Sequence, residues 1–474
     1  MAIHAPRRSA ATLLAASMLF VLLAATPALA TGIRLSRSIG PPTSTTTVSG
    51  AGFGANEGVD VTFDGTRIAR ATADGSGAFS KKIAVPASAL PGDHEVKATG
   101  RSSGSFATAT FLVRTDWPRG EYDALNSGLN PYENVLTTSD VTGLTEDWFT
   151  GASGSPVVVG GLVYVNTATG LSAFDEATGT LQWESGVQTD GYAAPEVSKG
   201  VIYAGGAAGG LVAIDARTGV VGWTGGTIGL ITSASPVVWG GSVFVGTSSG
   251  HVYGFPTACA DPCAPTWVVD LSPADILSNP AVQDGVVYVT THKGYTYGYV
   301  YAFDAATGNE IWNAYGDPVG TPPVVMGTTV YAARGGQIFA YPTSCSTPCA
   351  PLWSTKPLNA GFRTLSGANG VLYGWTDPSL RAYDATTGDQ LWSASPGSAG
   401  IAPGAPAAAN GVLYAVSEEG DLRVLDATTG QVLITYDTAD TSAGRSAPAV
   451  VDGTVFFTGY NAQGSTLHAY RLTG

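Results

Sequence analysis

Residues 155–183 read SPVVVGGLVYVNTATGLSAFDEATGTLQW, and residues 194–223 read APEVSKGVIYAGGAAGGLVAIDARTGVVGW. Both stretches combine an early Pro, glycine turns between short apolar segments, an Asp-x-x-Thr-Gly turn and a closing Trp. Comparable stretches begin at Ser235, Asn279, Pro322, Ser366, Ala405 and Ala447. A spacing of about 40 residues matches one four-stranded blade of a β-propeller. The repeat therefore predicts an all-β domain with eight blades.

The first repeat divides into four expected strands. Residues 156–159, 162–166, 171–174 and 181–183 are short apolar segments separated by glycine-rich turns. The early Pro is tolerated because it lies at the start of a strand, where its missing N–H does not interrupt a ladder. The last repeat ends at residue 472 after only three such segments. We expect residues 144–149, which include Trp148, to supply its missing outer strand and close the ring.

The Asp-x-x-Thr-Gly turn has a structural explanation. Its carboxylate can accept hydrogen bonds from turn amides, and its Gly supplies the left-handed backbone conformation. The Asp residues are Asp175, Asp215, Asp304, Asp384 and Asp426, and the Trp residues that follow four of these turns are Trp183, Trp223, Trp312 and Trp392. The seventh repeat has Ile434 at the Trp position. We expect these residues to dock each blade onto its neighbour rather than to bind a metal.

This A-x-D-x-x-T-G-x-x-x-W pattern resembles the tryptophan-docking repeat of quinoprotein dehydrogenases that depend on pyrroloquinoline quinone (PQQ). The same repeat occurs in the wider PQQ-like family, which includes the propeller subunit of the outer-membrane assembly machinery. The resemblance covers residues 116–474, including the segment DWPRGEYDALNSGLNPYENVLTTSDVTGLTEDW that precedes the repeats. It implies a propeller over residues 117–474. It also raises the alternative of PQQ binding with calcium.

The four cysteines occur as two pairs, Cys259 with Cys263 and Cys345 with Cys349. Each pair replaces an Asp turn, in the third and fifth repeats, and a Trp follows it. Local disulfides in an oxidising compartment are the simplest interpretation. A four-Cys zinc site is the alternative, but the third and fifth blades of a propeller are not neighbours.

The first 114 residues have a different character. Arg7 and Arg8 precede a short apolar run, and Ala28-Leu29-Ala30 fits a cleavage site, so residues 1–30 are expected to be a signal peptide cleaved after Ala30. Residues 36–114 contain alternating strands such as VDVTF (59–63) and the turns Asp64-Gly65 and Asp74-Gly75. They resemble Ig-like β-sandwich domains of the IPT/TIG type. We expect a secreted protein without a membrane span.

The net charge and the absence of known catalytic motifs exclude several classes of function. A formal net charge of −14 without a basic run argues against nucleic-acid binding. No P-loop, dinucleotide or nucleophile-elbow motif is present. The quinoproteins of the resemblance carry an adjacent-cysteine disulfide, which this chain lacks. We therefore expect no catalytic, cofactor or metal residues and a non-catalytic binding or scaffolding role, with a PQQ-dependent dehydrogenase of alcohols or sugars as the alternative.

A binding propeller needs a surface for its ligand. Connections from each outer strand to the next inner strand surround one mouth of the channel. Here they contain Asp190, Tyr192, Asp275, Asp317, Arg363 and Arg445, together with Leu230 and Ile231. We expect this mixed surface to hold a protein, peptide or glycan, with Arg363 and Arg445 facing an anionic partner. The alternative is a solvated ring of loops. A monomer is expected.

Overall fold

The computed structural model describes residues 1, 30–189, 193–226, 228–229, 231, 235–276, 278–293, 297–316, 321–359, 361–376, 378–395, 404–417, 419–438, 440–443, 446–462 and 464–472. Most of the expected signal peptide, residues 2–29, lies outside this range. The described residues divide into an N-terminal unit, built mainly from residues 32–111, and a C-terminal unit that holds residues 112–472. No described helix is long and apolar enough to cross a membrane.

The N-terminal unit contains two sheets. One has the order β1 (Gly32–Leu35), β3 (Thr45–Ala51), β6 (Phe79–Ala84). The other has the order β2 (Ile39–Gly40), β8 (Phe106–Val113), β7 (Gly92–Gly100), β4 (Gly58–Phe63), β5 (Thr66–Thr72). Strand β4 buries Val59, Val61 and Phe63 on one face, which confirms the alternation seen in the sequence. These side chains contribute to the core of this unit.

The C-terminal unit is built from antiparallel sheets whose strands follow chain order. The first contains β11 (Ser153–Val159), β12 (Leu162–Thr167), β13 (Gly170–Asp175) and β14 (Leu181–Glu184). The second contains β15 (Glu196–Ser198), β16 (Val201–Gly206), β17 (Gly210–Asp215) and β18 (Val221–Thr224). The third contains β19 (Val237–Trp239), β20 (Ser242–Gly246), β21 (His251–Pro256) and β22 (Trp267–Asp270). The fourth contains β23 (Ala281–Gln283), β24 (Val286–Lys293), β25 (Tyr297–Asp304) and β26 (Glu310–Gly316).

The remaining sheets continue the pattern. The fifth contains β27 (Val324–Met326), β28 (Thr329–Arg334), β29 (Gln337–Pro342) and β30 (Trp353–Ser354). The sixth contains β31 (Phe362–Ala368), β32 (Val371–Thr376), β33 (Ser379–Asp384) and β34 (Gln390–Ala394). The seventh contains β35 (Ala407–Ala409), β36 (Val412–Val416), β37 (Leu422–Asp426) and β38 (Val432–Tyr436), with β9 (Leu129–Asn130) added. The eighth contains β39 (Ser442–Ala443), β40 (Ala449–Val451), β41 (Thr454–Asn461), β42 (Gly464–Leu472) and β10 (Leu144–Gly151), which follows the short 3-10 helix η1 (Val141–Gly143).

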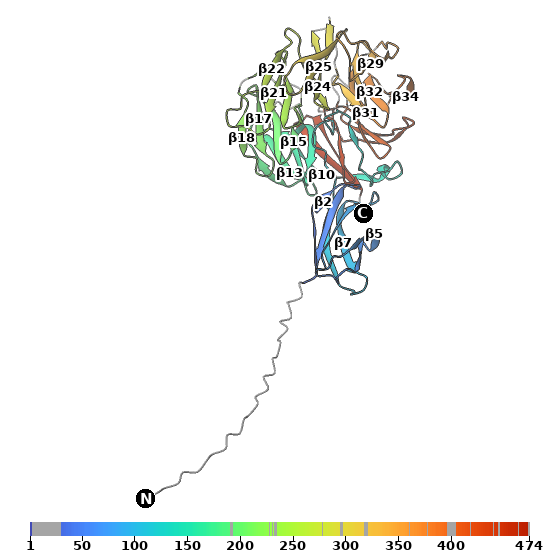
Figure 1. Cartoon of the computed structure of the whole chain (residues 1–474). Helices are drawn as coiled ribbons and strands as arrows, with labels where there is room; N and C mark the ends of the chain where they lie inside the picture. Colours follow the sequence, from blue (N-terminus) through green and yellow to red (C-terminus); the bar gives the residue numbers. More distant parts are fainter. Residues whose placement is uncertain are drawn as a thin grey trace. The chain divides into compact units, whose positions relative to one another are not determined.

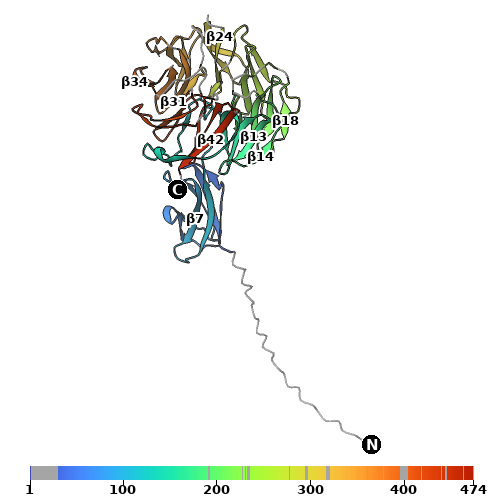
Figure 2. The ribbon, with the colours of Figure 1, turned by 180° about the vertical axis from the view of Figure 1, so that it is seen from behind.

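These sheets follow one another around the C-terminal unit, from green through yellow and orange to red (Figure 1). Strand β10 pairs antiparallel with β42, from Leu144 opposite Leu472 to Gly151 opposite Thr466. The predicted closure by the segment around Trp148 is therefore correct. Seen from behind, the red β42 lies beside the green β13 and β14 (Figure 2), and β11 contacts β40 and β41. The last sheet thus meets the first.

Apolar side chains fill the spaces between neighbouring sheets. Val157 and Tyr164 of the first sheet pack with Ile202 and Ile214 of the second in one buried cluster. Similar clusters join later pairs of sheets. Each sheet therefore buries both faces, which explains why strands such as β12 are apolar along most of their length rather than strictly alternating.

Candidate functional site

Residues 117–130, which we call the axial segment, run along the inner edges of the sheets. Its backbone carbonyls accept hydrogen bonds from the first strands of six sheets. The pairs are Val158 with Trp117, Val197 with Pro118, Val282 with Ala124, Val325 with Leu125, Gly367 with Ser127 and Ala408 with Gly128, at 2.6–2.9 Å. A first strand is otherwise an edge with unpaired amides. One irregular segment therefore occupies the axis on which these edges converge.

The inner strands of the two other sheets, the third and the eighth, form their hydrogen bonds with side chains instead. The carboxylate of Glu196, in the second sheet, accepts a hydrogen bond from the Val238 amide of the third. Asn130 Nδ2 donates to the Val450 carbonyl of the eighth sheet at 2.8 Å. Seven of the inner strands thus bond to the axial segment, and that of the third sheet bonds to Glu196 of its neighbour.

A buried polar cluster surrounds the axial segment. Arg119 is 1% exposed, donates from Nη1 to the Asp123 carbonyl at 2.8 Å, and places Nε 3.5 Å from Glu196 Oε2. Asn279 Nδ2 donates to Glu121 Oε1 at 2.6 Å. Each of these side chains makes at least one hydrogen bond or ion pair within the protein, so the cluster fixes the axial segment in place.

Burial controls the protonation of the cluster. It raises the pKa of Glu196 to about 7 and also raises the pKa of Glu121, while the Arg119 guanidinium opposes both shifts. Among the described residues, Arg119 Nη2, Glu121 Oε2 and Glu196 Oε2 have no hydrogen-bond partner. The cluster therefore keeps one guanidinium nitrogen and two carboxyl oxygens that a buried water could bond.

A calcium-bound quinone would require several oxygen ligands converging on one cation. Among the described residues, no group of three or more His, Cys, Asp or Glu side chains could hold a metal ion. Glu121 and Glu196 both lie near Arg119, which repels a cation. The described part of the channel does not fit this cofactor, and we derive no chemical step through it.

The predicted mouth residues are only partly described. Asp190, Tyr192, Asp317, Arg445 and Leu230 lie outside the described residues. Asp275 forms a β-bridge with His292, and the two side chains are 3.9 Å apart. Arg363 is exposed in β31. Ile231 is 1% exposed and packs with Tyr203 and Trp223, so the prediction that it faces the mouth is wrong.

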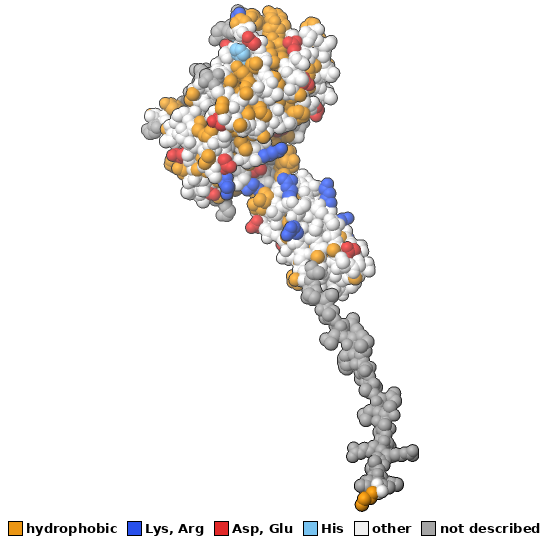
Figure 3. All heavy atoms as spheres, turned by 60° about the vertical axis from the view of Figure 1, so that its left-hand side comes forward, with side chains coloured by type: hydrophobic (Ala, Val, Ile, Leu, Met, Phe, Trp, Pro, Cys, Tyr) orange, Lys and Arg blue, Asp and Glu red, His pale blue; other side chains and the backbone are white. Residues whose placement is uncertain are grey.

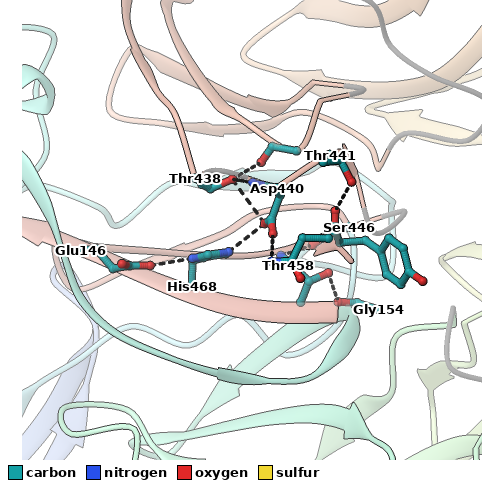
Figure 4. A network of polar contacts seen from close by, with 11 residues as sticks. Glu146, Gly154, Thr438, Asp440, Thr441, Ser446, Thr458 and His468 are labelled. Carbon is teal, nitrogen blue, oxygen red and sulfur yellow. Dashed lines mark hydrogen bonds and ion pairs between the residues drawn. The ribbon is translucent and has the colours of Figure 1, made fainter. Parts of the chain in front are cut away.

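A second polar network lies where the ring closes (Figure 4). His468 of β42 places Nδ1 2.6 Å from Glu146 Oε1 of β10 and Nε2 2.9 Å from Asp440 Oδ2. Asp440 also accepts hydrogen bonds from Thr438 and Asn461. Both ring nitrogens can donate only when the imidazole carries both hydrogens. Since carboxylates bond both nitrogens, the imidazole has no free nitrogen with which to activate a nucleophile. The network joins β10 to β42, the two strands whose pairing closes the ring of sheets.

The turns between the third and fourth strands contain the expected disulfides and Asp-x-x-Thr-Gly motifs. The disulfides Cys259–Cys263 and Cys345–Cys349 are both formed, as predicted. In the Asp turns, Asp175 Oδ1 accepts hydrogen bonds from the amide and hydroxyl of Thr178. The Trp side chains donate across to the next sheet, as when Trp183 Nε1 reaches the Ala216 carbonyl at 3.1 Å. The Asp residues therefore order their own turns, and the Trp residues dock each sheet onto the turn of the next.

The sequence analysis missed the axial cluster. Arg119, Glu121 and Asn126 belong to no repeated motif. Glu196 stands where the first and third repeats have valine, and Asn279 stands where other repeats have Ser, Ala or Pro. A carboxylate in place of an apolar residue, and the density of polar residues before the first repeat, were the signals that could have indicated it.

Comparisons with known proteins agree with this architecture. The chain resembles a quinohemoprotein alcohol dehydrogenase from Comamonas testosteroni, with 16% identity, 76% of this chain and 81% of that chain covered, and a TM-score of 0.62. It resembles BamB from Moraxella catarrhalis, with 18% identity, coverage of 69% and 97%, and a TM-score of 0.53. A europium-containing methanol dehydrogenase gives 13% identity, coverage of 75% and 98%, and a TM-score of 0.62. These likenesses show a β-propeller fold.

A shorter likeness concerns the serine/threonine-protein kinase AfsK of Streptomyces coelicolor, with 34% identity over 112 residues, or 23% of this chain. The match spans 14% of that protein's length. A family model matches far more of the chain, at residues 134–260, 257–344 and 296–473. The protein thus belongs to the PQQ_2 family, described as outer membrane protein assembly factor BamB.

Proposed function

We propose that this protein is an exported, non-catalytic binding or scaffolding β-propeller with eight blades, preceded by an Ig-like spacer domain at residues 36–114. Its partner, a protein, peptide or glycan, would bind at the channel mouth formed by the loops between sheets. The eight sheets and the closure of β42 by β10 support the blade number.

The axial segment is the observation that carries this proposal. It supplies hydrogen bonds to the inner strands, and Arg119 is engaged with Asp123 and Glu196. An axial segment bonded in this way holds the scaffold together, and the loops between the sheets would be the surface for a partner. Fold alone does not assign catalysis, since one fold hosts unrelated functions.

Two disulfides support export, because such bonds persist in oxidising compartments. The arginines at positions 7 and 8, the short apolar run and the Ala28-Leu29-Ala30 site support cleavage of a signal peptide after Ala30.

The second candidate is a PQQ-dependent dehydrogenase of alcohols or sugars. Its support is the fold likeness to a quinohemoprotein alcohol dehydrogenase and a europium-containing methanol dehydrogenase. Titration of the purified protein with PQQ and calcium, followed by absorbance, separates the candidates. We expect no stoichiometric uptake. Tight uptake at one equivalent would replace the binding proposal with the dehydrogenase.

For the mouth, we propose that Arg363 and Arg445 contact an anionic partner. Binding of a poly-glutamate peptide to the protein should weaken in the double variant Arg363→Ala plus Arg445→Ala, and most strongly at low salt. Equal affinity in the two proteins would remove these arginines from the site.

A further inference from the structure

A cleft of about 370 Å³ lies between the second and third sheets, at the hairpin turns that follow their first strands. Its lining includes Ser198, Lys199, Tyr203, Trp239, Gly240 and Thr257. The volume falls within the range of small-molecule sites. The turns that form it lie at the ends of the first strands, away from the loops of the predicted mouth, so this cleft is a separate surface.

The repeats provide an internal control for Trp239. In each sheet, the last residue of the first strand pairs with the first residue of the second and closes the hairpin. The closing residues are Val159, Ser198, Trp239, Gln283, Met326, Ala368, Ala409 and Val451. Seven sheets form this hairpin without an aromatic residue, so the fold does not require Trp239. Its side chain is nevertheless large, apolar and 39% exposed.

The first residue of each of these turns has a positive φ. The residues are Gly160, Lys199, Gly240, Asp284, Gly327, Asn369, Asn410 and Asp452, with φ from 47° to 74°. Gly, Asn and Asp are the residues that two-residue hairpins favour there. Lys199, at φ 50°, is the exception, and a bulky side chain in this conformation is uncommon and unfavourable. The turn of the second sheet thus keeps a lysine at a cost in stability.

Both departures from the repeat line the same cleft. Trp239 and Lys199 come from adjacent sheets, so two independent positions converge on one surface. Lysine is also rare in this unit, where Lys199, Lys293 and Lys356 are the lysines after residue 114. On the face drawn in Figure 3, few Lys or Arg side chains are seen over the C-terminal unit. Local rules that are broken together at one place indicate a functional site.

We propose that this cleft binds a sugar ring that bears an anionic group, either a carboxylate or a phosphate. The indole of Trp239 offers a flat apolar face for the C–H face of a pyranose, and its ring tip is braced over Gly285, where a Cβ would lie 3.4 Å from Cη2. Ser198 and Thr257 offer hydroxyl groups for the sugar hydroxyls. Lys199 supplies a point charge for the anion.

Calorimetric titration of the full chain tests the proposal with three probes: trigalacturonate, glucose 6-phosphate and the neutral trisaccharide maltotriose. We expect saturable binding of trigalacturonate or glucose 6-phosphate that weakens as salt is raised, and at least tenfold weaker binding of maltotriose. The two anionic probes distinguish a carboxylate from a phosphate ligand. Saturable binding of neither would overturn the proposal, as would equal binding of maltotriose.

The repeats also supply variants that the fold should accept. Trp239→Val installs the closing residue of the first and eighth sheets, and Lys199→Asn installs the turn residue of the sixth and seventh. We expect each to weaken binding at least tenfold, and Lys199→Asn to raise the melting temperature, because Asn is better tolerated at positive φ. Gln283→Ala, at the closing position of the fourth sheet, is the matched control and should leave binding unchanged. Unaltered affinity in the Trp239→Val and Lys199→Asn variants would contradict the proposed site.

Discussion

The fourth and fifth sheets fix the same turn, between their third and fourth strands, with different chemistry. In the fourth sheet, Asp304 Oδ1 accepts hydrogen bonds from the Thr307 amide at 2.9 Å and the Thr307 hydroxyl at 2.7 Å. In the fifth sheet, the Cys345–Cys349 disulfide closes a loop with a Cα–Cα distance of 5.6 Å. The third sheet uses the same device with Cys259–Cys263. The first turn depends on an ionised side chain and the other two depend on a covalent bond.

Both turns serve the tryptophan of the preceding sheet. Trp267 Nε1 donates to the Ala305 carbonyl beside the Asp turn at 3.0 Å, and Trp312 Nε1 donates to the Thr343 carbonyl beside the disulfide loop at 3.1 Å. Trp267 lies over Gly308, where a Cβ would come within 2.8 Å of the ring. Trp312 instead packs in a cluster that contains Cys349 and Cys345. The disulfide therefore also contributes apolar surface to the cluster that holds Trp312.

The disulfide loops add a backbone hydrogen bond to the preceding sheet, which the Asp turns do not show among the described residues. The Cys349 amide donates to the Asn313 carbonyl, and the Cys263 amide donates to the Thr224 carbonyl, both in the outer strand of the preceding sheet. Asp261, inside the other loop, accepts hydrogen bonds from the Thr224 amide and hydroxyl. Both kinds of turn accept the tryptophan of the preceding sheet. The Asp turn orders its own backbone with a carboxylate, whereas the disulfide loop also forms a backbone hydrogen bond to that sheet.

Removal of a docked tryptophan should lower the free energy of unfolding more than any other change proposed for these turns. Trp312 is fully buried, so Trp312→Ala should lower the free energy of unfolding by about 3–5 kcal/mol, through lost burial and a cavity. Trp267 is partly exposed, and Trp267→Ala should cost less. Calorimetric melting of both variants measures the difference. Tyr315→Ala, at an exposed position of the same strand as Trp312, is the control. A larger loss for Trp267→Ala would contradict our view of the disulfide loop.

Loss of a disulfide should cause the second-largest loss of stability. Cys345→Ala plus Cys349→Ala opens a five-residue loop, and the chain-entropy relation gives about 2 kcal/mol for a loop of that size. The loop's hydrogen bond to Asn313 should weaken with it. Melting of the double variant, compared with wild type with and without dithiothreitol, gives the value. If the double variant melts with the oxidised wild type, the hydrogen bonds rather than the disulfide fix the loop.

Much of this architecture was predictable because each repeat carries its own local evidence. The expected strand at residues 162–166 became Leu162–Thr167, and that at 181–183 became Leu181–Glu184. Ring closure was predictable because the last repeat visibly lacked a strand and the segment around Trp148 could supply one. The cysteines were predictable because each pair replaced a turn whose position was already known from the other repeats.

The axial segment could not be predicted because its conformation depends on contacts that are distant in the sequence. Its carbonyls bond to amides of six strands between Val158 and Ala408, so its conformation is set by the assembled sheets. Residues such as Arg119 and Asn126 fulfil their role only when those strand edges converge on the axis. The burial of Ile231 follows from the same kind of contact, with the side chain packed over Gly205 of a neighbouring strand.

The smallest expected effect comes from the Asp turn itself. Asp304→Ala should lower the free energy of unfolding by about 1 kcal/mol or less, because its hydrogen bonds are exposed to solvent. Hydrogen bonds from the Thr307 hydroxyl and amide lower the pKa of Asp304 below 3.8 in the folded state. The stabilisation is therefore present above pH 3.8 and is lost as the pH falls through the folded-state pKa. Melting at a series of pH values from 7 into the acid range should show the gap between wild type and Asp304→Ala narrowing as the pH falls, while the deficit of the Cys345–Cys349 double variant persists. A gap for Asp304→Ala that does not narrow in acid would mean that the turn does not depend on its ionised carboxylate, and the chemical distinction between the two turns would then reduce to the covalent bond alone.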